Sequence, residues 1–195
     1  MKRSLVAALL LVAGLQAYAQ EAPVPVGLQA RIFIKVLLFD RSYERRAGDG
    51  IVVGVLYQEA FRRSYLAAEE FAKAANAAWA DQAGSVPFRC VMIDVDGPSR
   101  LAESLPAAGV DILYVAPLRS YDVGKIAQAS RQMRLPAYTG VPEYLDAGLG
   151  VSLDLRDEKP RILINLAASK ESGAEYGSQL LSLARIVDGG ERKKP

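Results

Sequence analysis

The sequence predicts an α/β protein: a three-layer sandwich with a mixed, mainly parallel sheet, helices on both faces, and a C-terminal antiparallel hairpin plus a closing helix. Between residues 51 and 147, apolar β-branched runs alternate with segments whose apolar residues recur at helical spacing. Such alternation favours parallel strands joined by right-handed crossovers. From residue 148 onward, two strand-like runs lie close together, which predicts a hairpin and therefore a mixed sheet.

The N-terminus has the pattern of a signal peptide over residues 1–19. Lys2 and Arg3 precede an apolar run from Leu5 to Leu15, and Ala17-Tyr18-Ala19 supplies the small-x-small pattern of a cleavage site. The run is shorter than the about 20 residues that a spanning helix needs. We therefore expect an extended segment over residues 20–27 at the start of a mature protein that is soluble and periplasmic.

Residues 28–45 fit two secondary structures. The run from Ile32 to Phe39 is apolar enough for a buried strand, yet the apolar residues of this segment also fit helical spacing. In a helix, Arg31, Lys35 and Arg41 would project to one side. We expect the helix.

The middle of the chain is expected to alternate strands and helices. Ile51 to Tyr57 is a continuous β-branched run, as in a strand covered on both faces. Residues 60–83 are rich in Ala, with Phe71, Ala75 and Trp79 at helical spacing. The remaining strands are expected over residues 88–95, 110–116 and 136–141, the remaining helices over residues 98–105 and 122–133, and one helical turn over residues 142–147.

The C-terminal part is expected to form the hairpin and the closing helix. Residues 151–155 alternate apolar and polar, residues 156–160 are charged and suit a turn, and residues 161–166 are a more apolar strand. Residues 176–187 are expected to form the helix, before a flexible basic tail over residues 188–195. We therefore expect a single domain over residues 28–187.

Three stretches of this sequence match a known pattern: Gly148-Leu149-Gly150-Val151-Ser152-Leu153, then Arg161-Ile162-Leu163-Ile164-Asn165-Leu166-Ala167-Ala168-Ser169, then Gly177-Ser178-Gln179-Leu180-Leu181-Ser182-Leu183-Ala184-Arg185-Ile186-Val187. Their order resembles the C-terminal signature of the YfiR family, and Phe39-Asp40-Arg41 matches the step that ends the N-terminal helix of that family. Members are small exported bacterial proteins, and the best-studied branch restrains a membrane-bound diguanylate cyclase. The resemblance implies a non-enzymatic periplasmic regulator or sensor that binds an inner-membrane signalling protein.

Two absences constrain the chemistry. The chain contains no His, which excludes Ser-His-Asp and Cys-His catalysis and His-ligated metal sites in their usual forms. Its single Cys, Cys90, cannot form a disulfide within the chain, unlike the several cysteines of some YfiR-family members. The sequence therefore predicts no catalytic residue, no metal site and no cofactor.

The charge balance argues against nucleic acid as a partner. Without Lys2 and Arg3, the basic residues equal the 22 acidic residues, so the mature net charge is zero. Nothing in this balance favours electrostatic capture of nucleic acid or anionic lipid.

A ligand site is expected beyond the carboxyl ends of the parallel strands, where open α/β sheets usually bind ligands. The side chains there offer a ring, carboxylates, a guanidinium and hydroxyls, a mixture that suits a small polar ligand. Ordinary turn and capping chemistry is the alternative. The candidate ligand-binding residues are Tyr57, Asp94, Asp96, Arg119, Ser120 and Thr139.

The partner surface is expected on residues 28–45, where Arg31, Lys35, Arg41 and Arg45 place positive charge beside apolar residues. Such a basic stripe can steer the protein toward an acidic partner domain, although the same residues could equally serve only to solvate a packed helix. A homodimer is also compatible with the sequence. The alternative function is a solute-binding or transporter accessory protein with a single lobe.

Overall fold

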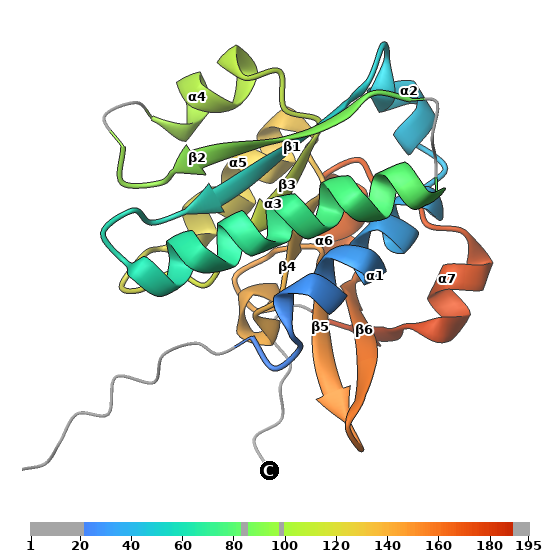
Figure 1. Ribbon diagram of the computed structural model, residues 1–195. Helices are drawn as coiled ribbons and strands as arrows, with labels where there is room; N and C mark the ends of the chain where they lie inside the picture. The colour runs from blue at the N-terminus through green and yellow to red at the C-terminus, as the bar shows by residue number, and fades with distance from the viewer. Residues whose placement is uncertain (1–21, 83–85, 98–99, 189–195) are drawn as a thin grey trace, which may run out of the picture.

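The chain folds around a seven-stranded sheet with helices on both faces (Figure 1). This computed structural model describes residues 22–82, 86–97 and 100–188. The expected signal peptide and most of the expected tail lie outside these residues. Within the described part of the chain, no helix combines the length and the apolar character that crossing a bilayer requires.

The sheet is mixed and mainly parallel, as predicted, with the order β2-β1-β3-β4-β5-β6-β7. The parallel part pairs β1 with β2 over its whole length, from Ile51 opposite Phe88 to Tyr57 opposite Asp94. The strands are β1 (Ile51–Tyr57), β2 (Phe88–Asp94), β3 (Ile112–Val115), β4 (Ala137–Thr139), β5 (Val151–Arg156), β6 (Lys159–Asn165) and β7 (Arg185–Val187).

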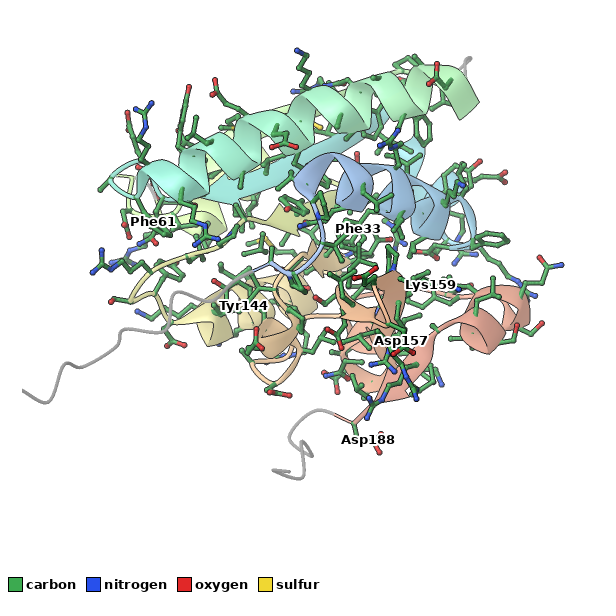
Figure 2. The ribbon with its side chains drawn as sticks, turned by 60° about the horizontal axis from the view of Figure 1, so that its bottom comes forward. Phe33, Phe61, Tyr144, Asp157, Lys159 and Asp188 are labelled. Carbon is green, nitrogen blue, oxygen red and sulfur yellow. The ribbon has the colours of Figure 1, made fainter. Side chains whose placement is uncertain are left out.

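The predicted hairpin is formed by β5 and β6, which pair antiparallel from Val151 opposite Ile164 to Arg156 opposite Lys159. The turn is tighter than the charged segment suggested, because only Asp157 and Glu158 lie outside the strands. Both have positive φ, 50° and 61°, as the twist of a two-residue hairpin loop requires. Figure 2 shows Asp157 and Lys159 at this end of the hairpin.

The prediction of a continuous helix over residues 176–187 is wrong in its extent. The helix α7 covers only Ser178–Leu183, and Arg185–Val187 form strand β7, which pairs parallel with β6. The apolar residues Leu180, Leu183 and Val187 fit helical spacing, but Ile186 and Val187 are β-branched and the free edge of β6 offers them hydrogen bonds. A short helix, α6 (Leu166–Glu171), was not predicted; it begins where the Asn165 side chain accepts a hydrogen bond from the Ala168 amide at 3.1 Å.

The ambiguous N-terminal segment is helical as expected as far as Leu38, but residues 39–42 leave the helix, so Arg41 does not project from it. Helix α1 starts at Val26, inside the segment expected to be extended, and ends at Leu38. The helices are α1 (Val26–Leu38), α2 (Tyr43–Ala47), α3 (Arg62–Gln82), α4 (Leu101–Ala107), α5 (Val123–Met133), α6 and α7, with a 3₁₀ turn over Pro142–Leu145.

Two hydrophobic cores fill the sandwich, one on each face of the sheet. Helices α1 and α3 cover one face, and the core between them and the sheet includes Phe33, Phe71 and Tyr114. The rings of Phe71 and Tyr114 stack with centroids 3.4 Å apart. Figure 2 shows Phe33 beneath α1. Helices α4 and α5 cover the opposite face, where Ile126 packs against the alternate residues of β3 such as Leu113.

Candidate functional site

The strand order places a topological switch point between the carboxyl ends of β1 and β3. Helix α3, which follows β1, and helix α5, which follows β3, cover opposite faces of the sheet. Crevices at such points are the usual ligand sites of open α/β sheets. This edge is therefore where the predicted ligand-binding residues are expected to meet.

The side chain of Gln58 occupies the centre of this edge. Its Nε2 donates to Asp96 Oδ2 at 2.9 Å, and its Oε1 accepts from the Arg119 amide at 2.5 Å. Gln58 is buried and links the segments that follow β1, β2 and β3. It was absent from the candidate residues, and its position directly after the buried strand β1 is the signal that could have identified it.

The carboxylates at the end of β2 serve the local backbone. Asp94 Oδ1 accepts from the amides of Glu59 and Asp96, both at 3.2 Å. Asp96 lies in the turn beyond β2. Tyr57, half-buried beside them, packs edge-to-face on Tyr65 with centroids 5.6 Å apart. Burial, followed by the charges of Glu59 and Asp94, raises the pKa of Tyr57.

The other candidate ligand residues are dispersed. Arg119 and Ser120 are exposed in the loop after β3, and Ser120 has a φ of 53°. Thr139 is 0% exposed; its hydroxyl donates to the Val115 carbonyl at 2.9 Å and accepts from the Val141 amide at 3.1 Å. The structure thus gathers Tyr57, Asp94, Asp96 and Arg119 around Gln58 and keeps Thr139 inside the core. A ligand role for this set stays a prediction.

The predicted partner residues lie in two electrostatic settings. Arg31 and Lys35 are exposed on one face of α1, and Arg41 is exposed just beyond its end; none of the three forms an ion pair with another described residue. Arg45, in contrast, is ion-paired with Glu175. The free positive charge of this surface therefore comes from Arg31, Lys35 and Arg41.

A buried junction holds the end of α1 against the segment before α7. Asp40 is 0% exposed; its Oδ1 accepts from the Ser42 amide at 2.9 Å, the Ser42 hydroxyl at 2.6 Å and the Glu175 amide at 2.8 Å. Its Oδ2 accepts from the Arg46 guanidinium, which also donates to the Gly173 carbonyl at 2.8 Å. Four groups thus fix one carboxylate.

The backbone of the same two segments is joined directly. The Arg41 amide donates to the Glu175 carbonyl at 2.9 Å, and the Gly177 amide donates to the Phe39 carbonyl at 3.3 Å. Above this junction lies an open groove of about 520 Å³ between residues 38–44 and 177–179. Phe39, 39% exposed, and Arg41 line it together with Gln179.

Two features of the described residues concern metal binding and nucleophilic chemistry. Among them, no group of three His, Cys, Asp or Glu side chains is arranged to hold a metal ion. Burial raises the pKa of the Cys90 thiol to about 12, so its nucleophilic thiolate is scarce at neutral pH.

Comparison with solved structures shows the fold. The chain resembles an ABC domain in complex with L-Trp from Streptococcus pneumonia, with a TM-score of 0.59 and 15% identity over 84% of this chain and 62% of that one. It also resembles a ligand-free, open substrate-binding protein with adhesive properties from Clostridium difficile, with a TM-score of 0.50 and 14% identity over 80% of this chain and 59% of that one. A third similar structure is a conserved domain protein from Vibrio cholerae O1 biovar eltor, with a TM-score of 0.50 and 12% identity over 83% of this chain and 60% of that one. The chain thus spans about three fifths of the solved chains it matches.

Comparison with curated proteins gave no match. The family profile described as DUF4154, YfiR/HmsC-like, matches residues 56–185. This range contains the C-terminal signature as far as Arg185, and it includes the Gly177–Gln179 side of the groove. The chain therefore belongs to the YfiR/HmsC-like family.

Proposed function

We propose that this protein is a non-enzymatic periplasmic regulator that binds an inner-membrane signalling protein, of the kind that a diguanylate cyclase represents. The YfiR/HmsC-like family is a family of regulators rather than enzymes. The periplasmic location rests on the signal-peptide pattern of residues 1–19. Binding is the proposed mode of action because the Ser42 hydroxyl, which donates to the Asp40 carboxylate, is buried in the junction, and because burial raises the pKa of the Cys90 thiol.

The observation that carries the proposal is the surface formed by α1 and the groove beside it. Arg31, Lys35 and Arg41 are exposed and form no ion pair with a described carboxylate, and Glu44 lines the groove together with Arg41. Phe39 adds an exposed ring at the groove. Aromatic and Arg side chains are the residue types that contribute most of the binding energy at protein interfaces.

The buried junction prepares this surface for binding. Because Asp40 lies between Phe39 and Arg41 and is held by Ser42, Arg46 and the Glu175 amide, the backbone that carries both side chains is already ordered. A partner then loses less free energy in ordering the surface when it binds. The charge of the surface predicts a partner segment that is acidic and carries an apolar residue.

Charge reversal tests the proposal. Tagged mature protein would be used to capture partners from solubilised membranes of the native host, with identification by mass spectrometry. We expect Arg31→Glu combined with Arg41→Glu to abolish capture of the membrane protein. Arg45 is left unchanged because its reversal would also break the pair with Glu175.

Lys73→Glu is the matched control, since Lys73 is an exposed helical cation on α3 that lies outside the groove lining. All three substitutions are at the surface and should change the free energy of unfolding by less than about 0.5 kcal/mol each. Capture that survives the double reversal, or turnover of a substrate by the purified protein, would refute the proposal. Capture of a transporter subunit instead would support the solute-binding alternative.

A further inference from the structure

A second candidate surface lies on the opposite face of the sheet, in an open cleft between α4 and α5. Its volume is about 590 Å³, which is within the range of small-molecule sites. Its walls include Val95 and Gly97 after β2, and Tyr121 after β3. The cleft therefore sits beside the switch-point edge, on the side away from the α1 groove.

Hydrogen-bond donors dominate the polar lining of the cleft. Tyr121, Lys125, Gln128 and Gln132 are spaced by four, three and four residues, so α5 and the segment that leads into it present them on one side. Arg100 faces them from the start of α4. No carboxylate belongs to the described lining.

The two cations of the cleft are not used by the fold. Within the described residues, neither the Arg100 guanidinium nor the Lys125 ammonium forms an ion pair or a side-chain hydrogen bond. Arg131, on the same helix as Lys125, does have a carboxylate partner, since its guanidinium lies 3.6 Å from Glu171. The cleft thus holds two cations that have no ion-pair partner among the described residues.

Two carboxylates near Tyr121 each accept a hydrogen bond from within the protein. Asp96 accepts from Gln58 at 2.9 Å, and Asp122 accepts from the Gly124 amide at 3.0 Å. Burial, followed by the charges of Asp96 and Asp122, raises the pKa of Tyr121. Its hydroxyl is therefore protonated at neutral pH and available as a donor.

We propose that this cleft binds a small organic dianion, which carries either a phosphomonoester or two carboxylates. Arg100 is suited to bidentate contact with an oxyanion, and Lys125 adds a point charge on the facing wall. Gln128, Gln132 and Tyr121 would donate to the remaining oxygens. The apolar side chains of Leu101 and Ala129 line part of the same space, which suits a ligand with a carbon skeleton better than a bare ion.

Calorimetric titration of the full mature protein with phenyl phosphate and with succinate tests the proposal. We expect saturable binding of at least one probe, with a dissociation constant of about 1 mM or lower. Binding of phenyl phosphate alone would assign a phosphomonoester, and binding of succinate alone would assign a dicarboxylate. Absence of saturable binding for both probes would overturn the proposal.

Neutralising variants locate the site. Arg100→Gln and Lys125→Gln should each weaken binding of the active probe about tenfold, the effect of losing one charge-assisted hydrogen bond. Lys73→Gln, on helix α3 on the other face of the sheet, should leave it unchanged, and melting temperatures should confirm that all three variants fold. If Arg100→Gln and Lys125→Gln bind as the unmodified protein does, the dianion site is elsewhere and the inference is wrong.

Discussion

Replacing Asp40 by Ala should destabilise the protein far more than any other single carboxylate loss near the groove. The substitution removes the acceptor of the Ser42 amide, the Ser42 hydroxyl and the Glu175 amide, and it leaves Arg46 without its ion-pair partner. The Arg46 side chain is only 16% exposed, so water restores little of the lost interaction. Removing one partner of a buried ion pair typically costs about 3–5 kcal/mol.

The free energy of unfolding is measured by chemical denaturation of the mature protein and Tm by heating, both monitored by circular dichroism. For a chain of this size the cost corresponds to a fall in Tm of about 6–20 °C. A double-mutant cycle with Arg46→Ala should give a coupling energy of about 0.5–3 kcal/mol, because Arg46 and Asp40 are in direct contact. Once Asp40 is removed, Arg46→Ala no longer breaks their ion pair.

Arg45→Ala is the control, since it removes an ion pair in which both side chains are more than half exposed. That change should cost about 1 kcal/mol or less. If Asp40→Ala costs no more than Arg45→Ala, or if the effects of Asp40→Ala and Arg46→Ala simply add, the junction does not hold the two segments together in the way described.

Three further predictions concern packing and reactivity. Leu180→Ala should cost about 2–5 kcal/mol because Leu180 is 1% exposed, whereas Leu183→Ala should stay within about 0.5 kcal/mol because Leu183 is 69% exposed; equal denaturation midpoints would contradict this assignment of the two faces of α7. Gly140→Ala should cost about 1–3 kcal/mol of unfolding free energy, since a Cβ there would lie 2.1 Å from Gln29 Oε1. If Gly140→Ala costs as much in a protein that already carries Gln29→Ala, this clash is not the cause. Iodoacetamide should label folded Cys90 much more slowly than the denatured chain at pH 8, because burial raises the folded pKa from 9.0 to about 12. The same shift contributes stability that is complete below pH 9 and is lost between pH 9 and about 12. Equal labelling rates of the folded and denatured chains, measured by mass spectrometry, would contradict the burial of this thiol.

Local patterns were sufficient for most of the framework. The β-branched run Ile51–Tyr57 forms a strand with the predicted bounds, because burial on both faces leaves no alternative for so apolar a segment. The N-terminal segment was ambiguous between strand and helix. Tertiary packing against α3 selects the helix there, with Phe33 and Ile34 on its buried face.

Where the pairing partner decides the structure, local patterns failed. Residues 185–187 could continue a helix, but the edge of β6 is in reach and they pair with it. The Asp40 junction was equally hidden, since Phe39-Asp40-Arg41 and Gly177-Ser178-Gln179 matched the family as separate signatures, and nothing local indicated that they meet. The central position of Gln58 was not predicted for the same reason, because its hydrogen-bond partners come from the ends of two other strands.

The junction around Asp40 also bears on the order in which the chain can fold. Ser42 and Gly173 lie 131 residues apart, and Asp40 and Glu175 lie 135 residues apart. Contacts of such separation carry a large loop-closure cost, which is offset only when the intervening sheet is already in place. A chain that emerges from its N-terminus therefore makes α1 early and anchors its far end late. The groove over the junction exists only on a completed molecule, so a protein that recognises this groove distinguishes finished chains from unfinished ones.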